Sequence, residues 1–138
     1  MELVEISTDI KIDPGAPEPY VIASEAELKI SFYSLDERDF TKDISAIQEK
    51  ITLQFKPCLN FRMGTPGSET IYGHPYYESG ITTGGFYELK DSDWINQLMK
   101  IDQVHPYFNL SKWKKYKHYI LVFHDSLFEC IASDFEIM

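Results

Sequence analysis

Near the C-terminus, two apolar runs flank a short polar break in the stretch HYILVFHDSLFECIASDF, residues 118–135. Apolar runs of this length on both sides of turn-forming residues are typical of a β-hairpin. A two-residue turn with Asp125 and Ser126 at its tip fixes the register of the two strands. The register pairs three residues of each strand: Phe123 with Phe128, Val122 with Glu129, and Leu121 with Cys130.

Alternation along this hairpin predicts one apolar face and one mixed face. The apolar face carries Tyr119, Leu121, Phe123, Phe128, Cys130 and Ala132. The other face carries His118, Ile120, Val122, His124, Leu127, Glu129 and Ile131. A turn one residue longer moves Glu129 to the apolar face, where an unpaired carboxylate costs several kcal/mol. That penalty favours the shorter turn.

Alternating apolar residues predict further strands upstream. The segments AELKISFYSL, residues 26–35, and AIQEKITLQF, residues 46–55, both show this pattern. The charged stretch DERDFTKD, residues 36–43, is predicted to be the loop between them. Pro57 interrupts the second run, and alternation resumes over residues 59–63. The sequence therefore predicts another strand after a kink or bulge.

The remaining segments predict two loops, a short strand and one helix. The stretch DPGAPEP, residues 13–19, holds three prolines and is predicted to be a loop or an edge crossing. Residues 64–85 are rich in glycine and turn formers, and FYEL, residues 86–89, follows as a short strand. A helical period then appears over residues 92–101, with Asp91 or Ser92 as its N-cap. The apolar stripe of this helix consists of Trp94, Ile95, Leu98 and Met99.

These elements predict a single domain over residues 1–138 with a mainly-β α+β fold. We expect an antiparallel curved sheet or a two-layer sandwich, with the principal helix across one face or edge. The N-terminal third should supply an edge strand and the proline-rich crossing. A hydrophobic fraction of 43% is sufficient for a core without disulfides. We therefore expect Cys58 and Cys130 to be buried free thiols.

The formal net charge of −9 is concentrated in the N-terminal part of the chain. The first 50 residues carry twelve acids and five bases (−7), and the other 88 carry ten acids and eight bases (−2). This balance favours a basic protein partner and disfavours nucleic acid, because binding phosphates requires clustered Lys and Arg. The lysines of KWKKYKH, residues 112–118, are best explained as a solvated rim beside a buried strand.

The chain shows none of the sequence features that direct a protein into or across a membrane. No apolar run approaches the roughly 20 residues that span a bilayer. The N-terminal stretch MELVEISTDI lacks the basic and apolar regions of a secretory signal. The sequence therefore predicts a cytoplasmic protein that does not bind membranes.

Three polar residues are candidates for chemistry: His74, His124 and Glu129. In the predicted register, Glu129 lies diagonal to His124 and would raise its pKa toward that of a general base. His74 would close over the pair as a second base or a metal ligand. In the structural alternative, His124 and Asp125 bond the turn backbone and Glu129 pairs with Arg62 or a lysine. The structural alternative is favoured, because nothing in the sequence brings His74 near His124.

Other candidates for chemistry have simpler structural explanations. Cys130 points to the apolar face, where burial reduces thiol reactivity, and Asp91 and Asp93 are explained by helix capping. The motifs GxSxG, GxxxxGK, CxxC and HExxH are missing, so no cofactor or metal site is predicted. The candidates for recognition are aromatic or polar residues beside prolines: Tyr76, Tyr77, His105 and Tyr107.

The segments GHPYY, FYELKDSDWINQL, VHP and HYILVFHDSLFECIA together resemble a group of small bacterial proteins with the pattern GHP…nSxWI…HP…FHDxxFE. The resemblance covers residues 58–132, implies a shared fold, and carries no assigned activity. It makes the matching positions site candidates by association: Gly73, His74, Pro75, Ser92, Trp94, Ile95, His105, Pro106, Phe123, His124, Asp125, Phe128 and Glu129.

Two functional hypotheses follow from these observations. The first is a non-enzymatic acidic interaction protein that binds a basic protein partner. Immunity and antitoxin proteins have this size and sign of charge, and they provide an analogy for such a function. The alternative is a small hydrolase or metal-binding protein that uses His74, His124 and Glu129.

Overall fold

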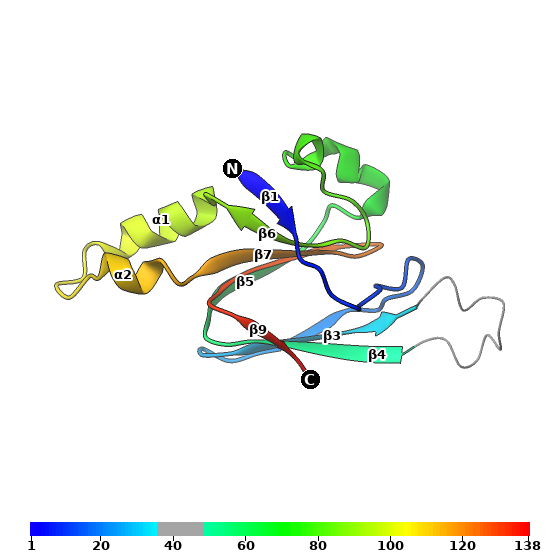
Figure 1. The fold of residues 1–138 in the computed structure, drawn as a ribbon, viewed down its shortest axis with the longest axis horizontal. Helices are drawn as coiled ribbons and strands as arrows, with labels where there is room; N and C mark the ends of the chain where they lie inside the picture. The colour runs from blue at the N-terminus through cyan, green and yellow to red at the C-terminus, as the bar shows by residue number, and fades with distance from the viewer. Residues whose placement is uncertain (36–48) are drawn as a thin grey trace.

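Two antiparallel sheets pack face to face in the computed structural model, which describes residues 1–35 and 49–138 (Figure 1). The five-stranded sheet has the order β1-β6-β7-β8-β5. Its strands are β1 (Glu2–Glu5), β5 (Cys58–Gly64), β6 (Phe86–Lys90), β7 (Lys117–Val122) and β8 (Leu127–Ala132). The four-stranded sheet has the order β2-β3-β4-β9. Its strands are β2 (Tyr20–Ala23), β3 (Leu28–Ser34), β4 (Glu49–Phe55) and β9 (Phe135–Ile137).

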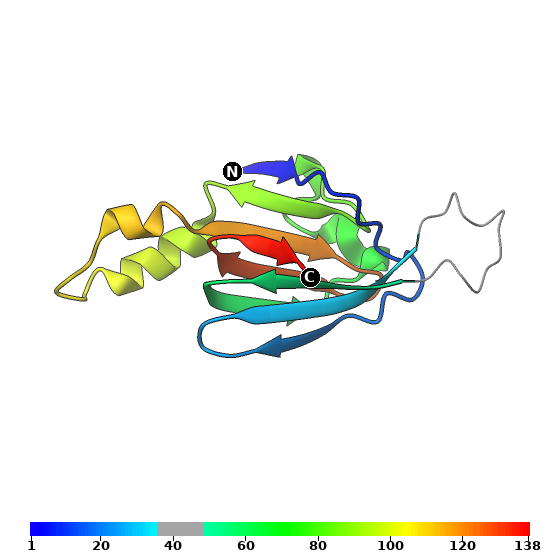
Figure 2. The same cartoon turned by 60° about the horizontal axis from the view of Figure 1, so that its bottom comes forward.

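This arrangement confirms the predicted mainly-β α+β fold in its two-layer form (Figure 2). The predicted strand of residues 59–63 is β5, and a register irregularity near Leu59 confirms the expected bulge. The loop predicted at residues 36–43 lies outside the described residues, as do the first residues of the strand predicted at 46–55.

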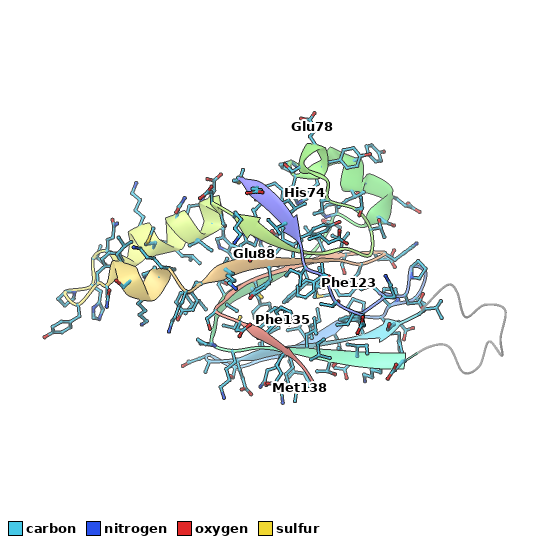
Figure 3. The ribbon with its side chains drawn as sticks, in the orientation of Figure 1. His74, Glu78, Glu88, Phe123, Phe135 and Met138 are labelled. Atoms are coloured by element: carbon cyan, nitrogen blue, oxygen red, sulfur yellow. The ribbon has the colours of Figure 1, made fainter. Side chains whose placement is uncertain are left out.

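The main core fills the space between the two sheets. Alternation on β7 and β8 directs the predicted apolar face of the hairpin into this space, where it meets β3 and β4. Phe123 packs edge-on against Phe32 with ring centroids 5.3 Å apart, and Phe55 lies 5.2 Å from Tyr119. Full burial of one such side chain contributes about 2 kcal/mol. Figure 3 shows Phe123 and Phe135 between the sheets, and His74 on the outer side of the five-stranded sheet.

The turn of the C-terminal hairpin lies one residue earlier than predicted. The amide of Phe123 donates to the carbonyl of Ser126 at 2.9 Å, so His124 and Asp125 form the tip. The observed pairs are Val122 with Leu127, Leu121 with Phe128, Ile120 with Glu129, and Tyr119 with Cys130. The predicted pairs are therefore wrong by two residues. A shift of two leaves every side chain on its predicted face, so alternation could not distinguish the two registers.

A helical arm extends beyond the end of the five-stranded sheet (Figure 1). It consists of α1 (Asp93–Asp102) and α2 (Leu110–Trp113). Ser92 is the N-cap of α1, which confirms the predicted helix and ends it one residue later. The apolar stripe of α1 packs against the buried side chains of Trp113, Tyr116 and Ile131. The lysines between residues 112 and 117 are exposed, as predicted.

The glycine-rich segment, residues 64–85, covers the outer face of the five-stranded sheet at the end away from the helical arm (Figure 1). It contains two 3-10 helices that were not predicted, η3 (Ser68–Gly73) and η4 (Tyr77–Ser79). Beneath them, Ile71 and Ile81 join the outward residues of β6, β7 and β8 in a second cluster. A Cβ on Gly67 would lie 2.9 Å from the carbonyl oxygen of His124. Glycine therefore permits the backbone of this segment to dock on the hairpin turn.

The N-terminal third supplies edge strands to both sheets. β1 lies at one edge of the five-stranded sheet, and β2 lies at one edge of the other. Residues 13–19 between them form no strand, as the prolines predicted. The short strand β9 was not predicted, and it carries the chain from the hairpin back to the four-stranded sheet. No helix among the described residues is both long enough and apolar enough to cross a bilayer.

Candidate functional site

A chain of polar side chains crosses the outer face of the five-stranded sheet. Arg62 comes from β5, Glu129 from β8 and His118 from β7, so three strands of one sheet supply the first three members. The fourth and last member, Ser92, lies at the N-terminus of α1. We call these four residues the polar network.

Short hydrogen bonds connect the polar network from end to end. The guanidinium of Arg62 donates to both carboxylate oxygens of Glu129, at 2.6 and 3.1 Å. Oε1 of Glu129 lies 2.8 Å from Nε2 of His118, and Nδ1 of His118 lies 2.7 Å from Oγ of Ser92. Oγ of Ser92 also accepts the amide of Ile95 at 3.2 Å. The Glu129 carboxylate accepts from Nε2 of His118, and the other ring nitrogen shares a hydrogen bond with the Ser92 hydroxyl.

The network is buried except at Arg62. The side chain of His118 is 0% exposed and that of Glu129 is 6% exposed, whereas that of Arg62 is 52% exposed. Burial alone would raise the pKa of Glu129, but the hydrogen bonds and charges of His118 and Arg62 outweigh it and lower the pKa to about 2. The same carboxylate raises the pKa of Arg62. Glu129 is therefore ionised throughout the physiological pH range.

Aromatic rings surround the network on its solvent side. The Arg62 guanidinium stacks 4.2 Å from the centre of the Trp94 ring, and Trp94 meets His118 edge-on at 5.3 Å. His74 and Tyr76 come from the glycine-rich segment, and their ring centroids are 4.7 Å apart. Burial lowers the pKa of His74, the charge of Glu129 opposes that change, and Arg62 reinforces it. His74 therefore lies within electrostatic range of the network but is not a member.

Each of the three predicted chemical candidates has hydrogen-bond partners outside that set. His124 lies at the hairpin turn, where its Nδ1 is 2.9 Å from Oδ1 of Asp125, and the diagonal contact with Glu129 is not made. Glu129 instead pairs with Arg62, as the structural alternative proposed. His74 accepts the amide of Tyr76 through Nδ1 at 3.0 Å. Among the described residues, no three His, Cys, Asp or Glu side chains are arranged to hold a metal ion.

The predicted recognition residues differ in exposure. Tyr107 is 86% exposed at the end of the helical arm, and its amide donates to Nδ1 of His105 at 3.0 Å. Tyr77 is exposed on η4, whereas Tyr76 is partly buried against the cluster beneath the 3-10 helices. The loop between α1 and α2, which contains His105 and Tyr107, therefore lies at the opposite end of the five-stranded sheet from η3 and η4 (Figure 1).

The order Ser92, His118, Glu129 is that of a nucleophile, a base and an orienting acid. Three observations instead favour a structural role. The hydroxyl of Ser92 is occupied as the N-cap of α1, and the residue is only 3% exposed. His118 is inaccessible to solvent, and Arg62 neutralises the carboxylate that would orient it. The network therefore joins α1 to three strands with its buried polar atoms satisfied.

Two members of the network were assigned no such role from the sequence. Ser92 was predicted as a cap, and His118 was placed on the same face as Glu129, but their connection was not predicted. In the observed register, His118 lies opposite Ile131 and is therefore diagonal to Glu129. A turn with His124 and Asp125 at its tip would have indicated this contact.

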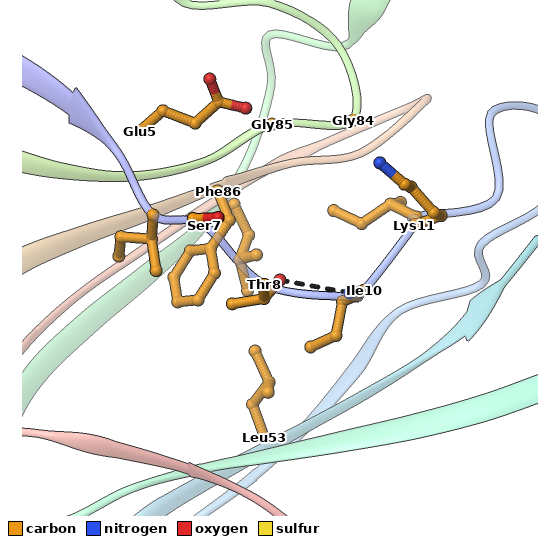
Figure 4. A pocket seen from close by; sticks show the side chains of 12 residues that line it. Glu5, Ser7, Thr8, Ile10, Lys11, Leu53, Gly84, Gly85 and Phe86 are labelled. Carbon is orange, nitrogen blue, oxygen red and sulfur yellow. Dashed lines mark hydrogen bonds between the residues drawn. The ribbon is translucent and has the colours of Figure 1, made fainter. Parts of the chain in front are cut away.

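Two cavities lie away from Arg62 and Glu129, the ion pair of the polar network. One of about 410 Å³ lies between α1, α2 and the adjoining ends of β6 and β7, and Ser92 is at its wall. Another of about 310 Å³ opens at one end of the sandwich, between the N-terminal segment and Gly84–Gly85 (Figure 4). Its floor is apolar, with Leu53 and Phe86, and Glu5 and Lys11 lie at its rim. His74, His124 and Glu129 line neither cavity.

The two thiols lie in the core and are both free. Burial raises the pKa of Cys130 well above its usual value, which supports its exclusion as a nucleophile. A hydrogen bond with Cys130 lowers the pKa of Cys58, against the effect of burial. The prediction of buried free thiols is confirmed.

Comparisons of this chain with models of known protein families, with curated proteins and with solved structures found no match.

Proposed function

We propose that this chain is a non-enzymatic interaction protein that binds a basic protein partner through the acidic N-terminal part of its surface. The proposal includes the bacterial cytoplasm as its site of action, where reducing conditions keep Cys58 and Cys130 as thiols. Membership of the bacterial group with the GHP…FHDxxFE pattern is part of the same proposal and adds no activity.

The observation that carries the proposal is the exposure of carboxylates in the first 50 residues. Six acids in the described part of this region are exposed: Glu2, Glu5, Asp9, Glu18, Glu25 and Glu49. Lys11 and Lys50 are the exposed bases described there, and the Lys50 amine lies 4.6 Å above the Tyr20 ring. These exposed side chains carry six negative and two positive charges, and such an excess of negative charge accelerates association with a basic partner.

The polar network also supports the proposal, because its acid and base are poorly placed for catalysis. A catalytic acid or base needs an accessible group, but His118 is wholly buried and Glu129 is bonded on both oxygens. All buried side-chain nitrogen and oxygen atoms of the described residues have a hydrogen-bond partner. The buried polar groups therefore contribute to structure, and the exposed charges are available for binding. Immunity and antitoxin proteins provide the functional analogy.

The test begins with cross-linking capture from source cells at low ionic strength, followed by purification of the captured protein. Association rates are then measured for three forms of the chain over a range of salt concentrations. The first is wild type, and the second carries Asp9→Asn, Glu18→Gln and Glu25→Gln. The third is a control with the same loss of charge on the remaining part of the surface: Glu69→Gln, Glu78→Gln and Glu136→Gln.

We expect a basic partner whose association slows with increasing salt. The N-terminal variant should associate about tenfold more slowly than wild type at low salt, because it loses electrostatic steering. The control should change the rate less than the N-terminal variant. A captured partner without net positive charge would contradict the proposal, as would equal effects of the two charge variants.

A further inference from the structure

The cavity between the helical arm and the five-stranded sheet is lined in part by apolar side chains. It has a volume of about 410 Å³. Ile95 and Met99 line it from α1, and Leu110 and Trp113 line it from α2. Trp113 is only 8% exposed, whereas Leu110 is 51% exposed. A concave, partly apolar surface of this volume is in the size range of sites that bind small molecules.

Tyr116 lines the same cavity, and its hydroxyl has no hydrogen-bond partner among the described residues. The residue is 8% exposed, and its ring centroid lies 5.7 Å from that of Trp113. The indole nitrogen of Trp113, by contrast, donates to Asp102 at 2.9 Å. Every fully buried side-chain nitrogen and oxygen of the described residues has a partner, so the Tyr116 hydroxyl is the accessible end of its side chain. Burial raises the pKa of Tyr116, so the hydroxyl is a donor at neutral pH.

Basic side chains outnumber acidic ones around the cavity. Three lysines and two acids line it: Lys90, Lys114, Lys117, Glu88 and Asp91. Nζ of Lys90 lies 3.2 Å from Oε2 of Glu88, so these two charges neutralise each other. Lys114 and Lys117 are exposed and have no ion pair among the described residues, and Asp91 is the one acid left without an amine partner there. The cavity therefore has a net positive charge, although the chain as a whole carries −9.

We propose that this cavity binds a small organic carboxylate with an apolar body. The apolar body packs on Ile95, Met99 and Trp113, and the carboxylate accepts from the Tyr116 hydroxyl and from the unpaired lysines. Donors without internal acceptors beside an apolar surface match this class of ligand and disfavour a cation. The cavity is separate from the acidic N-terminal residues, so this inference does not depend on the basic partner.

The first experiment compares two probes with the same apolar body and opposite charge. 4-Phenylbutyrate and 4-phenylbutylamine are titrated into the ¹⁵N-labelled chain, and binding is followed at the indole N–H resonances. The chain has two tryptophans, of which Trp113 lines the cavity and Trp94 does not, and Trp94→Phe assigns the two resonances. We expect a saturable shift of the Trp113 resonance, with a Kd of about 0.1–1 mM for the carboxylate and at least about tenfold weaker binding of the amine. The Trp94 resonance should shift less.

Three variants locate the carboxylate of the probe. Lys114→Gln combined with Lys117→Gln removes the unpaired amines and should weaken 4-phenylbutyrate binding at least about fivefold. Lys100→Gln combined with Lys112→Gln removes the same charge from lysines that do not line the cavity, and should change the Kd less than about twofold. Tyr116→Phe removes one donor, and should weaken binding of the carboxylate about threefold without weakening binding of the amine.

The four substituted lysines are exposed, so both double variants should fold, and the indole resonances report the fold directly. The absence of a saturable Trp113 shift up to about 5 mM 4-phenylbutyrate would overturn the proposal, as would equal affinity for the two probes. Equal effects of the two lysine double variants would also overturn it, because the charge of the whole arm would then select the anion. An unchanged Kd in Tyr116→Phe would contradict the assigned donor.

Discussion

At Glu129, burial and hydrogen bonding act on the pKa in opposite directions. Burial disfavours the charged carboxylate, but bonds from His118 and Arg62 hold it ionised and lower the pKa from 4.5 to about 2. A carboxyl whose pKa is lower in the folded state stabilises the fold when it is ionised. The network therefore links the stability of the fold to pH.

We predict that Glu129→Gln destabilises the protein by about 1–3 kcal/mol at neutral pH, because buried donors lose an ionised acceptor. Arg62 is half-exposed, so solvent screening reduces its share of this loss. The contribution of Glu129 is complete above the unfolded-state pKa and is lost as pH falls through the folded-state value. The difference between wild type and variant should therefore be largest above about pH 5 and should shrink toward pH 2. Urea titrations at several pH values measure it.

Glu78→Gln is the matched control, because Glu78 is exposed on η4 (Figure 3). It should change the free energy of unfolding by less than about 0.5 kcal/mol. A constant difference between wild type and Glu129→Gln from pH 7 to pH 2 would contradict the assigned role of the carboxylate.

At the scale of elements, the network fixes α1 to the sheet through its N-cap. Two helices of the arm begin with a side-chain cap, but only one cap is buried. Ser92 accepts the amide of Ile95 and also bonds His118, whereas Asn109 accepts the amide of Ser111 in an exposed position. Variants of the two caps therefore distinguish the stability gained from capping alone from that gained from a cap that also bonds to the buried His118.

We predict that Ser92→Ala costs about 2–3 kcal/mol, the sum of a lost cap and an unsatisfied Nδ1 on His118. Asn109→Ala should cost about 1 kcal/mol or less, because it loses the cap alone. Urea denaturation with unchanged m-values would give both differences. Equal costs for the two variants would mean that the bond between Ser92 and His118 makes no net contribution.

The elements also show what alternation and capping rules could predict. The period-2 pattern placed the residues of β7 and β8 on their observed faces, and the rules for N-caps gave Asp91 or Ser92 as the start of α1, of which Ser92 is the cap. The register was missed because a shift of two residues preserves all faces, while it changes the diagonal neighbour of Glu129 from His124 to His118. The short strand β9 and the 3-10 helices were missed because three to six residues contain too few periods for a pattern.

At the scale of the whole molecule, the described part of the first 50 residues exposes six acids and two bases. This excess of negative charge supports the proposed binding of a basic partner by electrostatic attraction. Raising the salt concentration should weaken that binding, since screening acts on exposed charges.

The most direct test of the account is the affinity of the purified basic partner for two variants, measured at a temperature at which both are folded. One variant is Glu129→Gln, which disrupts the polar network, and the other carries Asp9→Asn, Glu18→Gln and Glu25→Gln. We predict a Kd within about twofold of wild type for Glu129→Gln and at least about tenfold weaker binding for the triple variant. The reverse result would contradict the account, because it would place function in the polar network and not on the acidic surface.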